Sequence, residues 1–205
     1  MERRPIVLLL VGLVFIGECH AQAVQHRHLI TTFGGGGGFT SMTTSIDSLG
    51  THGAETGSVR FAFAYALSGK WSLGAHYDRI GSDRTSSAAE LLRFTTYMIE
   101  GTYRPWTGPH ATLELQLAMG PSLMALKPWH QGLPYKTQSA ALALGIRYLH
   151  LFSGTLGAFV SLDYTASHSA SVTDYDGQPI KDADNNALEL AWNSERVNAG
   201  LVVRF

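Results

Sequence analysis

The chain has 205 residues, of which 45% are hydrophobic and 15% are charged, and its formal net charge at pH 7 is −1. A net charge this close to zero excludes the basic surface by which nucleic-acid-binding proteins are recognised. The charged fraction lies well below the value of about 25% that is usual in soluble domains, so the composition favours a protein that exposes apolar residues to something other than water.

The N-terminal segment has the pattern of a secretory signal peptide. Arg3 and Arg4 precede an uncharged apolar stretch over 6–16, and Ala21-Gln22-Ala23 then forms a small-x-small cleavage site. The apolar stretch is shorter than the roughly 20 residues that a transmembrane helix needs. We therefore predict a signal peptide over residues 1–23 and one mature domain over 24–205. Cleavage would remove Cys19, the single cysteine, which excludes a disulfide framework and a cysteine metal site.

Eight segments of the predicted mature chain alternate apolar and polar residues at about the length of a transmembrane strand. The first is interrupted by Gly34–Gly38, which we interpret as glycines that let a curved strand bend or let a large inward side chain lie against the backbone. A phosphate-binding loop is excluded there, because no Lys-Ser/Thr pair follows. The predicted strands cover 29–39, 59–67, 71–78, 97–103, 111–119, 140–148, 156–164 and 197–205. The segment from Ser86 to Tyr97 is ambiguous, since residues 88–93 could form one or two helical turns in the loop before the fourth strand.

The predicted connections alternate in length along the chain. Short ones cover 68–70, 105–109 and 152–154, and long polar ones cover 40–56, 82–90, 125–137 and 167–193. Alternating short turns and long loops are typical of bacterial transmembrane barrels, as are aromatic side chains gathered at two levels. The fold class that follows is all-β, an eight-stranded antiparallel up-and-down transmembrane β-barrel, with both termini at the end of the short turns.

The last strand alternates up to the final residue, with Leu201, Val203 and Phe205 on one face. This ending resembles the assembly signal of small eight-stranded bacterial outer-membrane β-barrel proteins of the OmpA transmembrane-domain, OmpX and OmpW type. The resemblance implies the outer membrane of a Gram-negative bacterium, periplasmic termini and recognition of the last strand by the barrel-assembly machinery. It also implies outer-membrane lipid and lipopolysaccharide as partners and a monomeric barrel, with an extracellular ligand reached through the loops.

The inward positions of the predicted strands carry an unusual number of charges. Similar depths are expected for Glu100, Glu114 and Arg147, and opposed pairs for Asp163 with Arg196 and for Arg60 with Asp78. Two interpretations stay open: a salt-bridged plug, or a narrow ion or solute path. The predicted lumen charge network consists of Arg60, His76, Asp78, Glu100, Glu114, Arg147, Asp163 and Arg196.

The function predicted from this pattern is non-enzymatic, a structural or surface-interaction role with minor solute or ion permeation. One alternative is a lipid A acyl hydrolase that uses His168, Ser169 and Asp174, although adjacent strand residues face opposite sides and position 170 is Ala. The other alternative is a secreted lipocalin-like barrel, which would be apolar inside. We expect no cofactor and no metal site, since the Asp174-x-Asp176-Gly177 segment is not followed by the spacing of an EF-hand.

Overall fold

The computed structural model describes residues 29–45, 51–82, 89–128, 135–169, 171–174, 176–181 and 184–205. The predicted signal peptide over 1–23 lies outside these residues. The described part contains no helix long and apolar enough to cross a membrane. Its strands are β1 (Leu29–Thr44), β2 (Thr51–Ala66), β3 (Trp71–Ser82), β4 (Ala89–Thr107), β5 (Ala111–Pro128), β6 (Tyr135–Leu151), β7 (Leu156–Ser169) and β8 (Leu190–Arg204).

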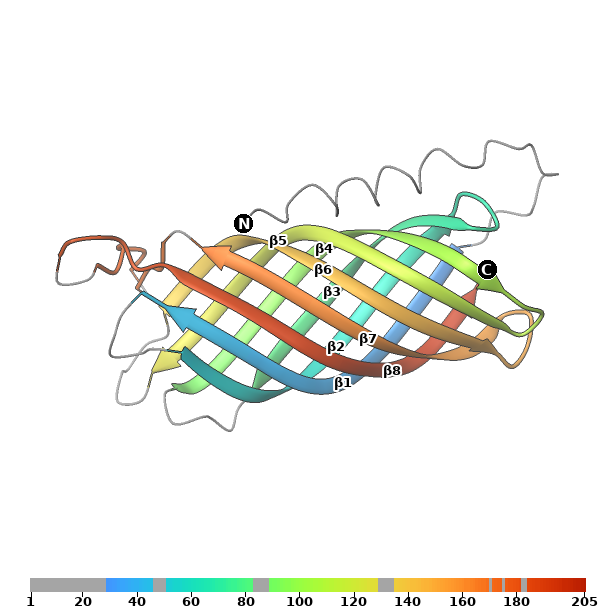
Figure 1. Cartoon of the computed structure of the whole chain (residues 1–205), viewed down its shortest axis with the longest axis horizontal. Coiled ribbons are helices and arrows are strands. Elements are labelled where there is room, and N and C mark those ends of the chain that lie inside the picture. Colours follow the sequence, from blue (N-terminus) through green and yellow to red (C-terminus); the bar gives the residue numbers. More distant parts are fainter. Residues whose placement is uncertain are drawn as a thin grey trace, which may run out of the picture.

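Each strand pairs antiparallel with its neighbours, and β8 pairs with β1, so the sheet closes into a barrel. A row of paired residues that starts at Leu29 and passes once around the sheet returns to β1 at Phe39, ten residues further on. Such a stagger tilts the strands by roughly 40° from the barrel axis and narrows the lumen of an eight-stranded barrel until side chains fill it. The tilt is visible in Figure 1, where the C-terminus and the short turns lie at one end. We call this the turn end, and the opposite end the loop end.

The predicted number, order and inner face of the strands are confirmed, whereas the predicted strand ends are wrong at the loop end. Most of the predicted loop over 40–56 belongs to β1 and β2, and residues 88–93, considered for helical turns, fall mostly within β4. Beyond the apolar zone, outward residues such as Glu55 and Arg93 are polar while the backbone still pairs. The outward residues stop being apolar where the strands leave the hydrocarbon layer of the membrane, but the strands remain paired beyond that point.

The outer surface of the wall is apolar and the inner surface is polar. Outward side chains such as Ile99, Met119 and Leu162 are more than 60% exposed, while Arg60, Asp78 and Glu114 inside are at most 1% exposed. The structure therefore contradicts the lipocalin-like alternative, which requires the reverse arrangement. It is the arrangement of a transmembrane barrel, in which every backbone group is paired and the oily face meets lipid.

Outward aromatic side chains pair at both margins of the apolar zone. Trp71 and Tyr103 have ring centroids 4.7 Å apart near the turn end, and Tyr77 and Tyr97 have theirs 5.3 Å apart toward the loop end. Aromatic rings at two levels mark the two membrane interfaces.

The glycine run lies in the middle of β1, where the strand crosses β8 closely. A Cβ atom built on Gly38 would lie 1.9 Å from the Glu195 carbonyl oxygen, and one built on Gly36 would lie 1.9 Å from the Val197 carbonyl oxygen. At Gly34 the same atom would lie 2.7 Å from the ring of Phe159. These inward glycines therefore allow both the close approach of the two strands and the packing of a large lumen side chain.

Substitution of Gly38 by alanine should weaken the seam that closes the barrel. We expect Gly38→Ala to lower the free energy of unfolding by about 1–3 kcal/mol, the usual cost of overpacking. The matched control is Gly37→Ala, because a Cβ atom there meets its nearest neighbour at 3.5 Å, and it should change the value by less than about 0.5 kcal/mol. Urea unfolding of the protein folded into lipid vesicles measures both. Equal effects of the two substitutions would contradict this account of the run.

Candidate functional site: the ionic interior of the barrel

All eight residues of the predicted lumen charge network lie inside the barrel. They come from the seven strands β2 to β8, with none from β1 or from a loop, and each is at most 5% exposed. A narrow, staggered barrel brings inward positions of distant strands to one level, so charges far apart in the sequence meet across the lumen.

One half of the network centres on Asp78. Arg60 donates to its two carboxylate oxygens from Nε and Nη2, at 2.8 and 2.7 Å, and both terminal nitrogens of Arg196 lie 3.2 Å from Asp78 Oδ2. The remaining terminal nitrogen of Arg60 donates to Asp163 Oδ1 at 2.8 Å. Asp78 is thus shared by two guanidinium groups, and Arg60 bridges two carboxylates.

The other half lies closer to the turn end and centres on Glu114. Arg147 donates from Nε to Glu114 Oε2 at 2.7 Å, and Arg104 donates from Nε to Glu114 Oε1 at 2.9 Å. Arg147 also lies 3.6 Å from Glu100, which accepts hydrogen bonds from Gln116 and pairs with His76 Nδ1 at 2.7 Å. Arg147 can contact both Glu100 and Glu114 because the three residues lie at similar depths in the barrel, as expected from the sequence.

Neutral side chains complete the coordination of the carboxylates. Asp163 accepts from Ser161 at 2.6 Å and from Asn198 at 2.7 Å, and Thr102 donates to Glu100 at 3.1 Å. Four arginines and four carboxylates are buried among the described side chains, so the network is neutral when His76 is uncharged. Burying charge is costly unless it is paired and hydrogen-bonded. The four carboxylates meet both conditions, whereas His76 Nε2 and Arg196 Nε are buried without a hydrogen-bond partner among the described residues.

The residues of the network were predicted from the sequence more completely than the contacts between them. Arg60 and Asp78 are paired, as expected, and Asp163 is the register neighbour of Arg196. The hydrogen bonds of Arg196, however, run across the lumen to Asp78 and along the wall to Thr165. Register identifies neighbours on adjacent strands, whereas long guanidinium side chains reach strands that are not adjacent.

Arg104 is a further member of the network that was not predicted from the sequence, and it lies beside a register shift between Tyr103 and Trp106. The predicted turn over 105–109 placed this residue at the end of a strand. Its even position continues the inward series of Glu100 and Thr102, and that signal would have identified it.

Two apolar clusters border the ionic network inside the barrel. At the turn end, the base cluster contains Ile30, Leu149, Phe159 and Val202. At the loop end, the mouth cluster includes Phe94 and Trp192, whose rings stack with centroids 4.2 Å apart. Val172 and Leu188, from the connection between β7 and β8, are at most 1% exposed and pack into the mouth cluster. The mouth cluster therefore covers the ionic network on the side of the loop end, while the base cluster packs beside its lower part, where the Arg147 guanidinium lies 5.9 Å from the centre of the Phe159 ring.

The residues considered for acyl hydrolysis do not form a catalytic set. His168 is exposed and its Nε2 lies 3.9 Å from Glu189, while Ser169 is buried and bonds to Thr137 and to the Ser171 carbonyl. Asp174 accepts a hydrogen bond from the Gln178 backbone within its own turn. Because His168 and Ser169 face opposite sides of the wall, the imidazole does not reach the hydroxyl that it would have to activate.

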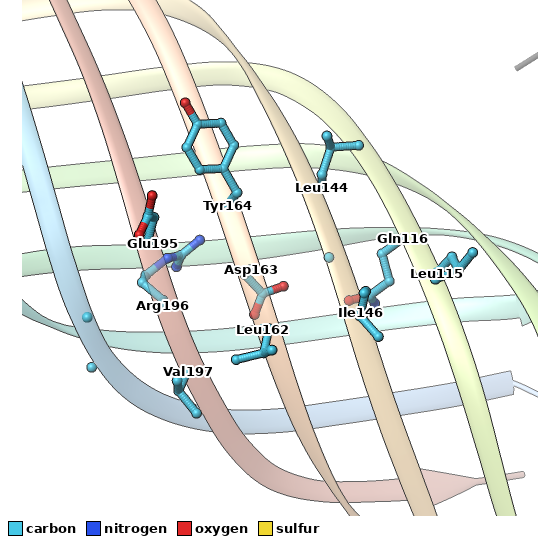
Figure 2. Close-up of a pocket in the computed structure, with 13 residues that line it drawn as sticks. Leu115, Gln116, Leu144, Ile146, Leu162, Asp163, Tyr164, Glu195, Arg196 and Val197 are labelled. Carbon is cyan, nitrogen blue, oxygen red and sulfur yellow. The ribbon is translucent and has the colours of Figure 1, made fainter. Parts of the chain in front are cut away.

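A hollow of about 660 Å³ lies on the wall over β5–β8 and β1 (Figure 2). Outward apolar side chains from two neighbouring rows form its edges, among them Leu144 with Tyr164 and Ile146 with Leu162, and glycine at position 37 leaves it open toward β1. Its lining also includes Gln116, Asp163 and Arg196, which belong to the inner face of the wall, and the outward Glu195. The exposed lining is mostly apolar and suits a lipid acyl chain, because the three inward residues are buried in the lumen network. Among the described residues, no group of three or more His, Cys, Asp or Glu side chains could hold a metal ion.

The terminal strand positions Leu201, Val203 and Phe205 on the outside of the wall. Leu201 and Phe205 are more than half exposed, and the Phe205 amide donates to the Leu29 carbonyl at 2.8 Å. The final residue thus reaches the first residue of β1 at the seam of the barrel.

Neutralising Asp78 should destabilise the barrel, because Arg60 and Arg196 would share one buried positive charge without its counterion. We expect Asp78→Asn to cost about 3–5 kcal/mol of unfolding free energy. The double variant Asp78→Asn/Arg196→Met restores neutrality and should recover part of that loss, which urea unfolding in vesicles measures as a coupling energy. Additive effects of the two substitutions would contradict a direct interaction.

Comparison with known proteins gives agreement at the level of the fold. No protein-family model and no curated protein sequence matches the chain. Neisserial surface protein A is similar over 88% of this chain and 100% of its own, with 12% identity and a TM-score of 0.59. The outer membrane protein OprG from Pseudomonas aeruginosa is similar over 87% of this chain and 95% of its own, with 10% identity and a TM-score of 0.59.

The outer membrane protease OmpT from Escherichia coli is similar over 92% of this chain and 99% of its own, at 9% identity. Its TM-score of 0.45 is too low to carry an argument about activity. The closed sheet, its apolar outer surface, its ionic interior and the first two structural similarities all support the same conclusion. This chain has the fold of the small eight-stranded outer-membrane β-barrel proteins.

Proposed function

We propose that the protein is a non-enzymatic outer-membrane barrel with a closed interior, whose wall holds the loop end at the cell surface for structural or surface-interaction roles. The observation that carries this proposal is the filling of the lumen by side chains. The ionic network and the base cluster occupy the lumen from the turn end to its middle, the mouth cluster lies beyond them, and the connection between β7 and β8 packs into the mouth cluster. An interior filled in this way supports rigidity rather than a water-filled path, so permeation is the less favoured role.

The proposed location is the outer membrane of a Gram-negative bacterium, with the turn end and both termini in the periplasm. Its support is the short turns beside Phe205 and the long connections at the other end, which is the usual orientation of such barrels. The exposed Phe205 and Leu201 on the seam strand suit recognition by the barrel-assembly machinery. Apart from lipid, lipopolysaccharide and an extracellular ligand at the loops, no further partner is proposed, and the barrel is expected to act as a monomer.

The closed interior predicts that the folded protein does not conduct ions. In planar lipid bilayers we expect no steady single-channel currents from the wild-type protein. Two variants would show whether any current passes through the lumen. Arg147→Gln changes a residue inside the lumen, and Arg79→Gln, on the outer face, is its control. Defined current steps from the wild-type protein that Arg147→Gln alters and Arg79→Gln does not would overturn the closed-interior proposal.

The positions of His168 and Ser169 predict that the protein leaves lipid A unchanged. Cells that produce the wild-type protein, cells that produce Ser169→Ala and cells without the protein should give the same acylation pattern of lipid A in mass spectra. A species that appears with the wild-type protein alone would contradict the non-enzymatic role and make Ser169 a candidate nucleophile.

A further inference from the structure

We propose that the outer face of β4, β5 and β6 near the loop end binds the phosphate groups of an outer-leaflet glycolipid of the lipid A class. The site is a groove of about 500 Å³ between Arg93 and Lys136. It depends on the proposed outer-membrane location and is independent of whether the lumen conducts.

Arg93 and Lys136 belong to one cross-strand row. Arg93 pairs with Ala125, and Ala125 pairs with Lys136, so the two cationic residues flank a small one. Two strand spacings separate them by about 10 Å. A phosphate placed over Ala125 would lie within reach of both long side chains, and a guanidinium group binds phosphate by two parallel hydrogen bonds.

Further polar groups line the same groove. Thr95 and Gln138 flank Leu123 in the next row, and Ser171 and Thr173 form the far wall. The backbone of Thr173 pairs with that of Lys136 in both directions, at 2.8 Å each. The wall of the groove is therefore anchored to β6 and is part of the folded barrel.

The level of the groove matches the phosphate layer of a membrane. Arg79 lies two residues beyond Tyr77 on β3, and Arg93 lies four residues beyond Tyr97 on β4, both toward the loop end. Tyrosine rings lie at the boundary between headgroups and acyl chains. The basic side chains therefore lie just outside that boundary, and the apolar Leu123 continues the lipid-facing surface below them.

The outward charged side chains described on β3–β6 are basic, and the nearest acidic residue on the far wall of the groove is Asp174, which follows Thr173. The acidic residues with described side chains on β3–β6 are Asp78, Glu100 and Glu114, and all three are buried in the lumen. Outward carboxylates lie on another part of the wall, where Glu195 and Glu55 flank Phe39 in a row across β8, β1 and β2. An anionic lipid is thus attracted more strongly to the strands β4–β6 than to the face that contains β1.

A second copy of the chain could offer its acidic row to the same basic face, but the groove favours a headgroup. Its concave surface carries hydroxyl and amide groups that suit a phosphorylated sugar, and head-to-tail contacts between copies would form open chains rather than a closed oligomer.

The test is native mass spectrometry of the folded full-length mature protein in detergent micelles with bisphosphorylated lipid A, and with the same lipid after removal of its phosphates. The wild-type protein should retain one bisphosphorylated lipid and bind the phosphate-free lipid about tenfold or more weakly, since one charge-assisted contact to phosphate corresponds to about that factor. The variant Arg93→Gln/Lys136→Gln should lose the preference for the phosphorylated lipid.

Two controls separate the site from general charge and from folding. Lys181→Gln removes a positive charge from the connection between β7 and β8 and should bind as the wild type does, and Arg93→Lys/Lys136→Arg should retain the preference. Each variant is first shown to be folded by the shift in gel mobility between unheated and heated samples.

Three outcomes would overturn the proposal. The first is equal binding of the two lipids or unchanged binding by Arg93→Gln/Lys136→Gln. The second is displacement of the lipid by millimolar inorganic phosphate, which would assign the groove to free phosphate. The third is a lipid-free dimer abolished both by Arg93→Gln/Lys136→Gln and by Glu55→Gln/Glu195→Gln, which would assign the face to a second copy.

Discussion

The pairing of buried charge inside a narrow closed sheet is the constraint on which the rest of the structure depends. An unpaired ion in such an interior costs several kcal/mol, so each arginine in the lumen needs a carboxylate at its own level. Asp78 serves both Arg60 and Arg196, and Glu114 serves both Arg104 and Arg147. Most of these contacts join adjacent strands, but the Asp78–Arg196 contact joins β3 to β8 and the Arg60–Asp163 hydrogen bond joins β2 to β7. The network therefore holds the barrel together across its lumen as well as around its wall.

Closure of the wall requires a second set of adjustments at the seam. The inward glycines of β1 let its backbone approach β8, and the ring of Phe159 occupies the space that side chains on Gly34 and Gly200 would need. Above the network, the connection between β7 and β8 folds back so that Val172 and Leu188 bury themselves beside Trp192. The seam, the ionic layer and the mouth thus favour one rigid state of the barrel.

The outer surface divides into levels that match the layers of an asymmetric membrane. Apolar side chains and two aromatic levels cover the acyl region, and charged outward residues begin only beyond Tyr77 and Tyr97. Those charges are sorted around the barrel, with basic residues on β3–β6 and carboxylates on β8 and β2. The outer surface therefore provides the groups that can distinguish membrane components, while the interior stabilises the fold.

The sequence by itself determined the strand number, the inner and outer face of each strand and most members of the ionic network, because strand periodicity assigns each residue a side and these assignments need only local information. It did not determine where strands end at the loop end, since polar outward residues there hide the alternation that identifies a strand. Nor did it determine the partners of Arg196, the inward position of Arg104 beside a register shift, or the groove between Arg93 and Lys136. These depend on the stagger of the closed sheet, which is a property of all eight strands together: ten residues of offset around the barrel decide which distant positions share a level.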